Sequence, residues 1–144
     1  MKSIADSKSI LVLEKISVEK LYFERLSDAV HRVESTDKIS FYHNLNKMED
    51  QLFRVRLGVV LNEDGKYRIE VEISGLFRLS EDSVLGKKIL ENNTVAILFP
   101  YLRSQLTLLS SQPDFEPIIL PALNINALLN EEWIILDNMW RDIA

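Results

Sequence analysis

The sequence contains no cysteine, has only four glycines and four prolines, and lacks any long apolar run. Without cysteine there is no disulfide, no thiolate nucleophile and no cysteine-ligated zinc site. The longest apolar run is residues 95–99, whereas a membrane-spanning helix needs about 20 such residues. The first apolar run, residues 10–13, is too short for the core of a signal peptide. We therefore expect a soluble, cytoplasmic protein that does not insert into a membrane.

An excess of positive charge is also missing. The chain has 22 acidic and 17 basic residues and a formal net charge of −5, so no basic patch is expected to neutralise nucleic-acid phosphates. The hydrophobic fraction of 47% and the charged fraction of 27% are typical of a folded globular protein. A length of 144 residues suits one domain, which we expect to span residues 1–144.

Catalytic motifs are absent as well. No nucleophile elbow, phosphate-binding loop or metalloprotease motif occurs, and the two histidines are His31 and His43. His43 alternates with apolar residues, which favours a structural role over a catalytic or metal-binding one. Adjacent acidic pairs such as Glu63 and Asp64 do not converge on one site. We expect no enzyme activity, no metal and no cofactor.

The first two-thirds of the chain shows the period-two alternation of an antiparallel sheet with one solvated face. Its four expected strands are residues 10–23, 38–46, 51–61 and 67–77. In the first strand Ile10, Val12, Ile16 and Val18 share a face, and the pattern changes phase after Lys20, which predicts a bulge there. The turn at residues 62–65, Asn-Glu-Asp-Gly, predicts a hairpin. Residues 25–37 are too long for a hairpin loop and predict a crossover.

Helical spacing dominates the last third. A short helical turn capped by Ser80 is expected first, and then a helix that begins within one turn of Pro100, where a missing N–H costs nothing. The alternative is a helix that begins near Thr94 and kinks at the proline. An extended, proline-rich connector follows at residues 113–124. The end predicts a second helix, capped by Asn124 or Asn126, with this apolar stripe: Ile125, Leu128, Leu129, Trp133, Leu136, Trp140 and Ile143.

Strands followed by helices indicate an α+β fold, in which two helices cover one face of a four-stranded antiparallel sheet. The opposite face would carry charged side chains, namely Arg54, Arg56, Arg68, Glu70 and Glu72.

Three segments together resemble the SecB family of bacterial protein-export chaperones. The first is residues 97–129. It opens with Leu98-Phe99-Pro100-Tyr101 and Arg103, similar to the Phe-Pro-Tyr-Ala-Arg signature of that family, and continues to a stretch similar to the family's Leu-x-Pro-x-Asn-x-x-Ala-Leu segment. The second and third are the end of the fourth strand and the Phe-Glu pair in the first. The matching residues outside the signature are Phe23, Glu24, Glu70, Val71, Gly75, Phe77, Phe115, Leu120, Pro121, Asn124, Ala127 and Leu128.

The resemblance implies a homotetramer built as a dimer of dimers, with Phe99, Pro100, Tyr101 and Arg103 as a structural and assembly signature. It also implies an ATP-independent holdase that keeps unfolded preproteins in apolar grooves and delivers them to the SecA motor. Ordinary core packing is the alternative for each groove candidate. The candidates are Leu26, Val30, Val33, Phe115, Ile118, Leu120, Leu123, Trp133 and Trp140.

The resemblance further implies a SecA-docking face, to which Glu24 and Glu70 correspond. Lys20 and Arg68 depart from the family pattern and add positive charge where a basic partner would dock, which costs affinity. The alternative function is therefore a SecB-like chaperone dedicated to one client, such as an antitoxin, without a translocase role. A small-ligand binder or enzyme, and a scaffold whose apolar patches only close an oligomer, also stay open.

Overall fold

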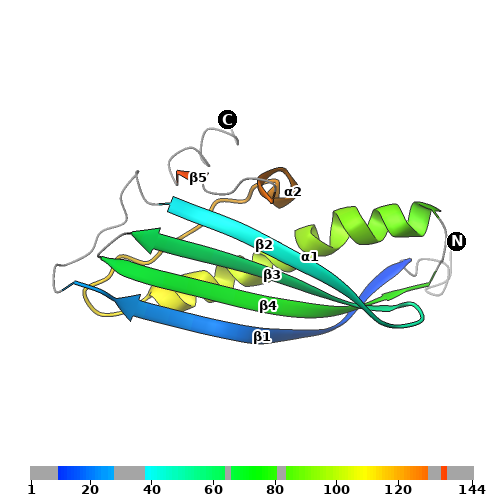
Figure 1. The fold of residues 1–144 in the computed structure, drawn as a ribbon, viewed down its shortest axis with the longest axis horizontal. Coiled ribbons are helices and arrows are strands. Elements are labelled where there is room, and N and C mark those ends of the chain that lie inside the picture. Colours follow the sequence, from blue (N-terminus) through cyan, green and yellow to red (C-terminus); the bar gives the residue numbers. More distant parts are fainter. Residues whose placement is uncertain (1–9, 28–37, 64–65, 81–83, 130–133, 136–144) are drawn as a thin grey trace, which may run out of the picture.

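The computed structural model describes residues 10–27, 38–63, 66–80, 84–129 and 134–135. Four long strands come first: β1 (Leu11–Arg25), β2 (Lys38–Glu49), β3 (Leu52–Glu63) and β4 (Tyr67–Leu79). They are followed by α1 (Val84–Ser110), α2 (Ile125–Leu128) and the two-residue strand β5 (Ile134–Ile135). Figure 1 shows the sheet as one twisted layer with α1 lying along one of its faces. The predicted α+β class, a four-stranded antiparallel sheet followed by a long helix, is confirmed.

The strand order is β1-β4-β3-β2-β5, and every neighbouring pair is antiparallel. Because β1 pairs with β4 and not with β2, the chain crosses the sheet between β1 and β2, as predicted. The register of Glu63 opposite Tyr67 confirms the β3–β4 hairpin. A second hairpin joins β2 to β3, and its residue Gln51 has a φ of 64°, the left-handed conformation that tight turns require.

The core lies between the sheet and α1. Alternate residues of β3 and β4, such as Leu57 and Ile73, are buried against Leu98, Leu102 and Leu106 of the helix. Gly75 is needed in this layer because a Cβ atom there would lie 2.8 Å from Leu98 Cδ2.

Two bulges divide β1. The register shifts between Val18 and Lys20, which confirms the predicted bulge, and shifts again between Leu13 and Lys15. The prediction that Val12 shares a face with Ile16 is wrong, because the bulge between Leu13 and Lys15 reverses the alternation between them.

Helix α1 corrects the prediction for Pro100. The helix begins at Val84 and runs through the proline without ending, so neither a start near Pro100 nor one near Thr94 is right. Ser80 is not its cap, because the Ser80 hydroxyl donates to the Ile10 carbonyl at 3.1 Å. Pro100 is exposed, so water can satisfy the carbonyl that its missing N–H leaves free. Buried residues on both sides of it hold the helix to the sheet.

The connector after α1 is tied to the end of that helix. Thr107 Oγ1 donates to the Ile118 carbonyl at 2.8 Å, and Ser110 Oγ accepts the Ile118 amide at 2.8 Å. Phe115 packs edge-on against Phe23 and Tyr67, with ring centroids 5.1 and 5.2 Å apart. These contacts fix an extended segment that has no ladder of its own.

The prediction of a long second helix in the C-terminal segment is wrong, because residues 134–135 form a strand. Helix α2 is a single turn that follows Asn124, and Ile134–Ile135 pairs with the start of β2 as a strand. Trp133, Leu136, Trp140 and Ile143 of the predicted stripe lie outside the described residues.

Candidate functional surfaces

The first candidate surface is an apolar strip between β1 and α1, on the helix side of the sheet. It is formed by Ile16, Val18 and Leu21 of β1, which are 37%, 45% and 51% exposed, and by Tyr101 of α1. Ile16, Val18 and Tyr101 line a hollow together with Ile73 and Gln105. The strip is open because α1 packs mainly over β4 and β3 and covers the edge strand β1 less.

Further large apolar side chains are exposed along the helix and the connector. They include Leu85, Ile97 and Leu108 of α1 and Ile119 beyond it, of which Leu108 and Ile119 are about two-thirds exposed. Only Ile16, Val18 and Tyr101 are shown to adjoin one another, at the hollow, and adjoining apolar side chains of this kind are typical of interaction sites. Their contacts are non-directional, so they can bind many apolar sequences.

The structure separates the predicted groove residues into three groups. Leu26 is exposed and Leu123 is half-buried. Phe115, Ile118 and Leu120 are at most 6% exposed, so they are core residues in this structure, in keeping with the core-packing alternative. Val30, Val33, Trp133 and Trp140 lie outside the described residues.

The four signature residues do not share one environment. Phe99 is buried against Phe41, with the ring centroids 6.2 Å apart, and anchors α1 to the sheet. Pro100 and Tyr101 are exposed, and Arg103 is half-buried. The signature therefore has one member in the core and another, Tyr101, in the apolar strip.

The second candidate surface is the outer face of the sheet, opposite α1. Glu70 is at its centre, and the Glu70 side chain is only 12% exposed. Lys20 Nζ lies 2.8 Å from Glu70 Oε2, and Arg68 Nη2 lies 3.4 Å from Glu70 Oε1. Burial alone would raise the pKa of Glu70, but the hydrogen bond and charge of Lys20, with Tyr42 and Arg68, outweigh it and lower that pKa.

Tyr42 joins Glu70 to Glu72 across this face. Its single hydroxyl hydrogen is shared between Glu72 Oε1, at 3.0 Å, and Glu70 Oε2, at 3.3 Å. Burial and the two acceptor carboxylates raise the pKa of the phenol. The ring lies over Gly58, where a Cβ atom would overlap it. Glycine on β3 therefore makes room for the phenol that bonds both carboxylates.

Glu24 of β1 is exposed and accepts a hydrogen bond from the Tyr22 hydroxyl. It pairs in register with Arg68. The structure thus brings the two predicted docking carboxylates onto one face but places a lysine and an arginine against Glu70. The predicted departures Lys20 and Arg68 are the residues that neutralise it.

Nothing in the described part of the chain resembles a catalytic centre. No three His, Asp or Glu side chains converge there in a way that could hold a metal. His43 is exposed, which corrects the expectation of a packed structural role, and His31 lies outside the described residues. Within the same ranges, no helix is long and apolar enough to cross a membrane.

Sequence reasoning missed Ile16, Val18, Leu21 and Tyr101 as surface residues. The strand pattern identified Ile16 and Val18 as apolar but could not show that α1 leaves them uncovered. The predicted bulge near Lys20 was the available signal, because bulges are common on edge strands.

The described residues form an antiparallel sheet with one long helix on one face and an apolar strip exposed beside the edge strand β1. The family model for preprotein translocase subunit SecB matches residues 6–133. The chain belongs to the SecB family and is a non-enzymatic chaperone of that family.

Two curated proteins are similar in sequence. The protein-export protein SecB of Methylococcus capsulatus is 28% identical over 129 residues, and the match covers 83% of each chain. The uncharacterized protein MJ0357 of Methanocaldococcus jannaschii is 32% identical over 62 residues, which are 42% of this chain. The chain spans only 40% of the length of that archaeal protein.

The solved structures that are similar in fold include one complex. It is the Mycobacterium tuberculosis Rv1957 SecB-like chaperone in complex with a ChAD peptide from the Rv1956 HigA1 antitoxin. The TM-score is 0.59 at 19% identity, and the match covers 78% of this chain and 87% of that one. At this identity the likeness establishes the fold alone.

Proposed function

We propose that the protein is an ATP-independent holdase that binds non-native polypeptides through exposed apolar surface. The observation that carries this proposal is the apolar strip of Ile16, Val18, Leu21 and Tyr101 in a SecB-family fold. Burying apolar area stabilises a complex by about 25 cal/mol per Å² without demanding a particular client sequence. Leu26, exposed just after β1, and Leu123, half-buried just before α2, are further candidates for client contact.

The test is suppression of aggregation. Purified protein should delay the aggregation of an unrelated, chemically unfolded polypeptide, and Val18→Ser with Tyr101→Ser should weaken the delay. Val12→Ser is the matched control, because Val12 is 36% exposed on the same strand but faces the other side of the sheet. No delay by the wild type at molar excess would exclude the holdase function.

The homo-oligomer, a dimer of dimers, is also proposed. β1 is an edge strand with an apolar face, and such an edge is a template for pairing with another chain. The apolar strip could therefore close an oligomer instead of holding a client. Native mass spectrometry distinguishes the two: a loss of assembly in Val18→Ser assigns the strip to the oligomer, and unchanged mass with weaker suppression assigns it to clients.

In the export function that we propose, the protein is cytoplasmic and delivers preproteins to SecA. SecA would dock on Glu24 and Glu70. The second candidate is a chaperone dedicated to one client, such as an antitoxin, without a translocase role. The ion pairs of Glu70 with Lys20 and Arg68 favour this second candidate, because a basic partner would have to displace both cations.

Binding to SecA separates the candidates. Lys20→Asp with Arg68→Leu should strengthen binding if SecA is a partner, since both changes free Glu70. Absence of binding in the wild type and in this variant would leave the dedicated-client function.

A further inference from the structure

Arg54 and Arg56 form an arginine pair on β3, on the outer face of the sheet. Their neighbours in the sequence, Val55 and Leu57, are fully buried on the helix side, so alternation places both arginines on the opposite side. Asn46 and Leu76 lie opposite Arg54 on the flanking strands. Asn44 and Ser74 lie opposite Arg56, so no carboxylate lies directly opposite either arginine, and both side chains are half-buried.

Neither arginine is neutralised by the described residues. The Nε atoms of both are closed off from solvent and have no hydrogen-bond acceptor there, and neither guanidinium has a carboxylate within ion-pair distance. Buried donors are nearly always satisfied, so these two Nε–H groups are unusual, and the Nη ends of the half-buried side chains, which are not closed off in this way, are where an acceptor from outside the chain could bind.

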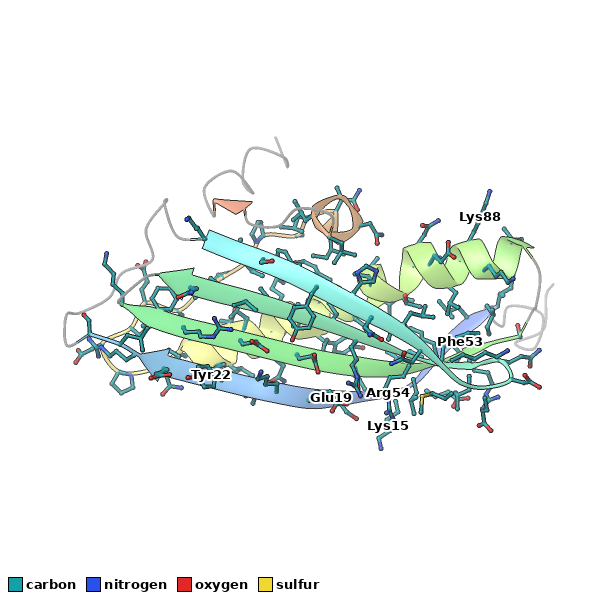
Figure 2. All side chains as sticks on the ribbon, viewed as in Figure 1. Lys15, Glu19, Tyr22, Phe53, Arg54 and Lys88 are labelled. Carbon is teal, nitrogen blue, oxygen red and sulfur yellow. The ribbon has the colours of Figure 1, made fainter. Side chains whose placement is uncertain are left out.

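The nearby carboxylates are bound elsewhere. Glu19 accepts from the Ser74 hydroxyl at 2.6 Å, and Glu14 accepts from Arg78 at 2.6 Å. Lys15 adds positive charge, since it lies opposite Leu76 and thus two strands from Arg54. Figure 2 places Lys15, Glu19 and Arg54 in the same part of the sheet.

We propose that the arginine pair is a docking site for a short acidic segment of a partner polypeptide. Guanidinium groups match carboxylates with paired N–H donors, and two of them at alternate strand positions match successive carboxylates of an extended peptide. Glu19 and Glu14 border the site and the chain is acidic overall, so a long polyanion such as nucleic acid is repelled. The site is separate from the apolar strip, which is on the other face.

The experiment uses fluorescence anisotropy with a labelled peptide of alternating glutamate and serine. Arg54→Gln with Arg56→Gln should weaken binding by about tenfold, the loss expected for two charge-assisted contacts, and added salt should weaken wild-type binding. The matched control is Lys87→Gln with Lys88→Gln, because it removes the same amount of charge from exposed positions of α1, on the other side of the sheet, and should leave binding unchanged. The same peptide with glutamine for glutamate should bind neither form.

A second measurement avoids dependence on the variant's folding. In the wild-type protein, the NMR signals of the Arg54 and Arg56 Nε–H groups should shift when the acidic peptide is added. Unshifted signals, equal binding to the folded Arg54→Gln/Arg56→Gln variant, or equal binding of the glutamine peptide would overturn the proposal. Tighter binding of an oligothymidylate than of the peptide would overturn it in favour of a nucleic-acid site. The variant should still delay aggregation, so failure of this site and failure of the holdase function are distinguishable.

Discussion

The Lys20–Glu70 ion pair should contribute measurably to stability, and this can be tested by removing each charge alone and both together. The changes are Lys20→Met and Glu70→Gln, which keep side-chain length. The Nζ–Oε2 distance is 2.8 Å, and the two side chains differ in burial, with Lys20 53% and Glu70 12% exposed. The pair is therefore neither fully exposed nor buried.

Its expected strength lies between two limits. Opposite charges about 3 Å apart attract by roughly 1.4 kcal/mol in water and by more where solvent is partly excluded. Ordering of the long lysine side chain opposes this, and fully exposed pairs yield about 0.2–1 kcal/mol. We expect a coupling free energy of about 1 kcal/mol from the double-mutant cycle.

The coupling should also depend on pH in a defined direction. The folded-state pKa of Glu70 is lowered from its ordinary value of 4.5, so the stability it contributes is fully present above 4.5. That contribution is lost as the pH falls through the lower folded-state pKa, where Glu70 takes up a proton. In Lys20→Met the pKa of Glu70 should rise, and the loss should begin at a higher pH.

Urea unfolding of the four proteins at pH 7 and at acidic pH, in low and high salt, measures the cycle. A coupling near zero at pH 7 and low salt would refute the idea that Lys20 neutralises Glu70. A coupling of the same size after Glu70 is protonated would show that it arises from packing and not from charge.

Three further changes test the packing of both faces. Tyr42→Phe should lower the free energy of unfolding by about 1 kcal/mol, because the hydroxyl shared between Glu72 and Glu70 is lost. Since the folded-state pKa of Tyr42 is raised, the stability that this group contributes in the wild type should be lost as the pH rises above 10.0. Tyr42→Phe should lack that alkaline loss in its unfolding curve. Gly58→Ala should destabilise by at least as much, because its Cβ displaces the Tyr42 ring, and should cost little when Tyr42 is already alanine. Leu102→Ala should cost about 2–5 kcal/mol in urea unfolding, since this side chain is fully buried between α1 and the sheet, and a cost below 1 kcal/mol would contradict its place in the core.

The sheet could be predicted from the sequence because alternation, turn residues and loop length all act locally. The crossover followed from a loop too long for a hairpin, and the bulge near Lys20 from a change of phase. The second bulge, between Leu13 and Lys15, leaves a weaker signal because apolar residues occupy both faces around it. Val12 was therefore assigned to the wrong face.

The helices were harder to predict, because tertiary contacts override local preference there. Pro100 predicts a boundary, yet Val95, Leu98 and Leu102 bury enough apolar surface around it to hold the helix through the proline. Ile134–Ile135 shows the opposite case, in which an apolar stretch with helical spacing pairs with a strand edge that only the folded sheet provides.

The choice of partner for the outer face of the sheet depends on which of its charges are unpaired, more than on how many acidic residues the chain contains. A carboxylate attracts a basic partner only to the extent that its charge is not already used within the chain. Glu70 is held by Lys20 and Arg68, whereas Arg54 and Arg56 have no carboxylate partner among the described residues. The two guanidinium charges on β3 are therefore unpaired among the described residues, although the chain as a whole is acidic. A partner that docks on the arginine pair must supply carboxylates, and a partner that docks on Glu70 must displace two cations from it at the cost of their interaction energy.

Lys20→Met should therefore raise affinity for a basic peptide without changing affinity for an acidic one. Arg54→Gln/Arg56→Gln should lower affinity for an acidic peptide without changing affinity for a basic one. Parallel changes in both affinities would mean that the face acts through its net charge and not through these two separate clusters.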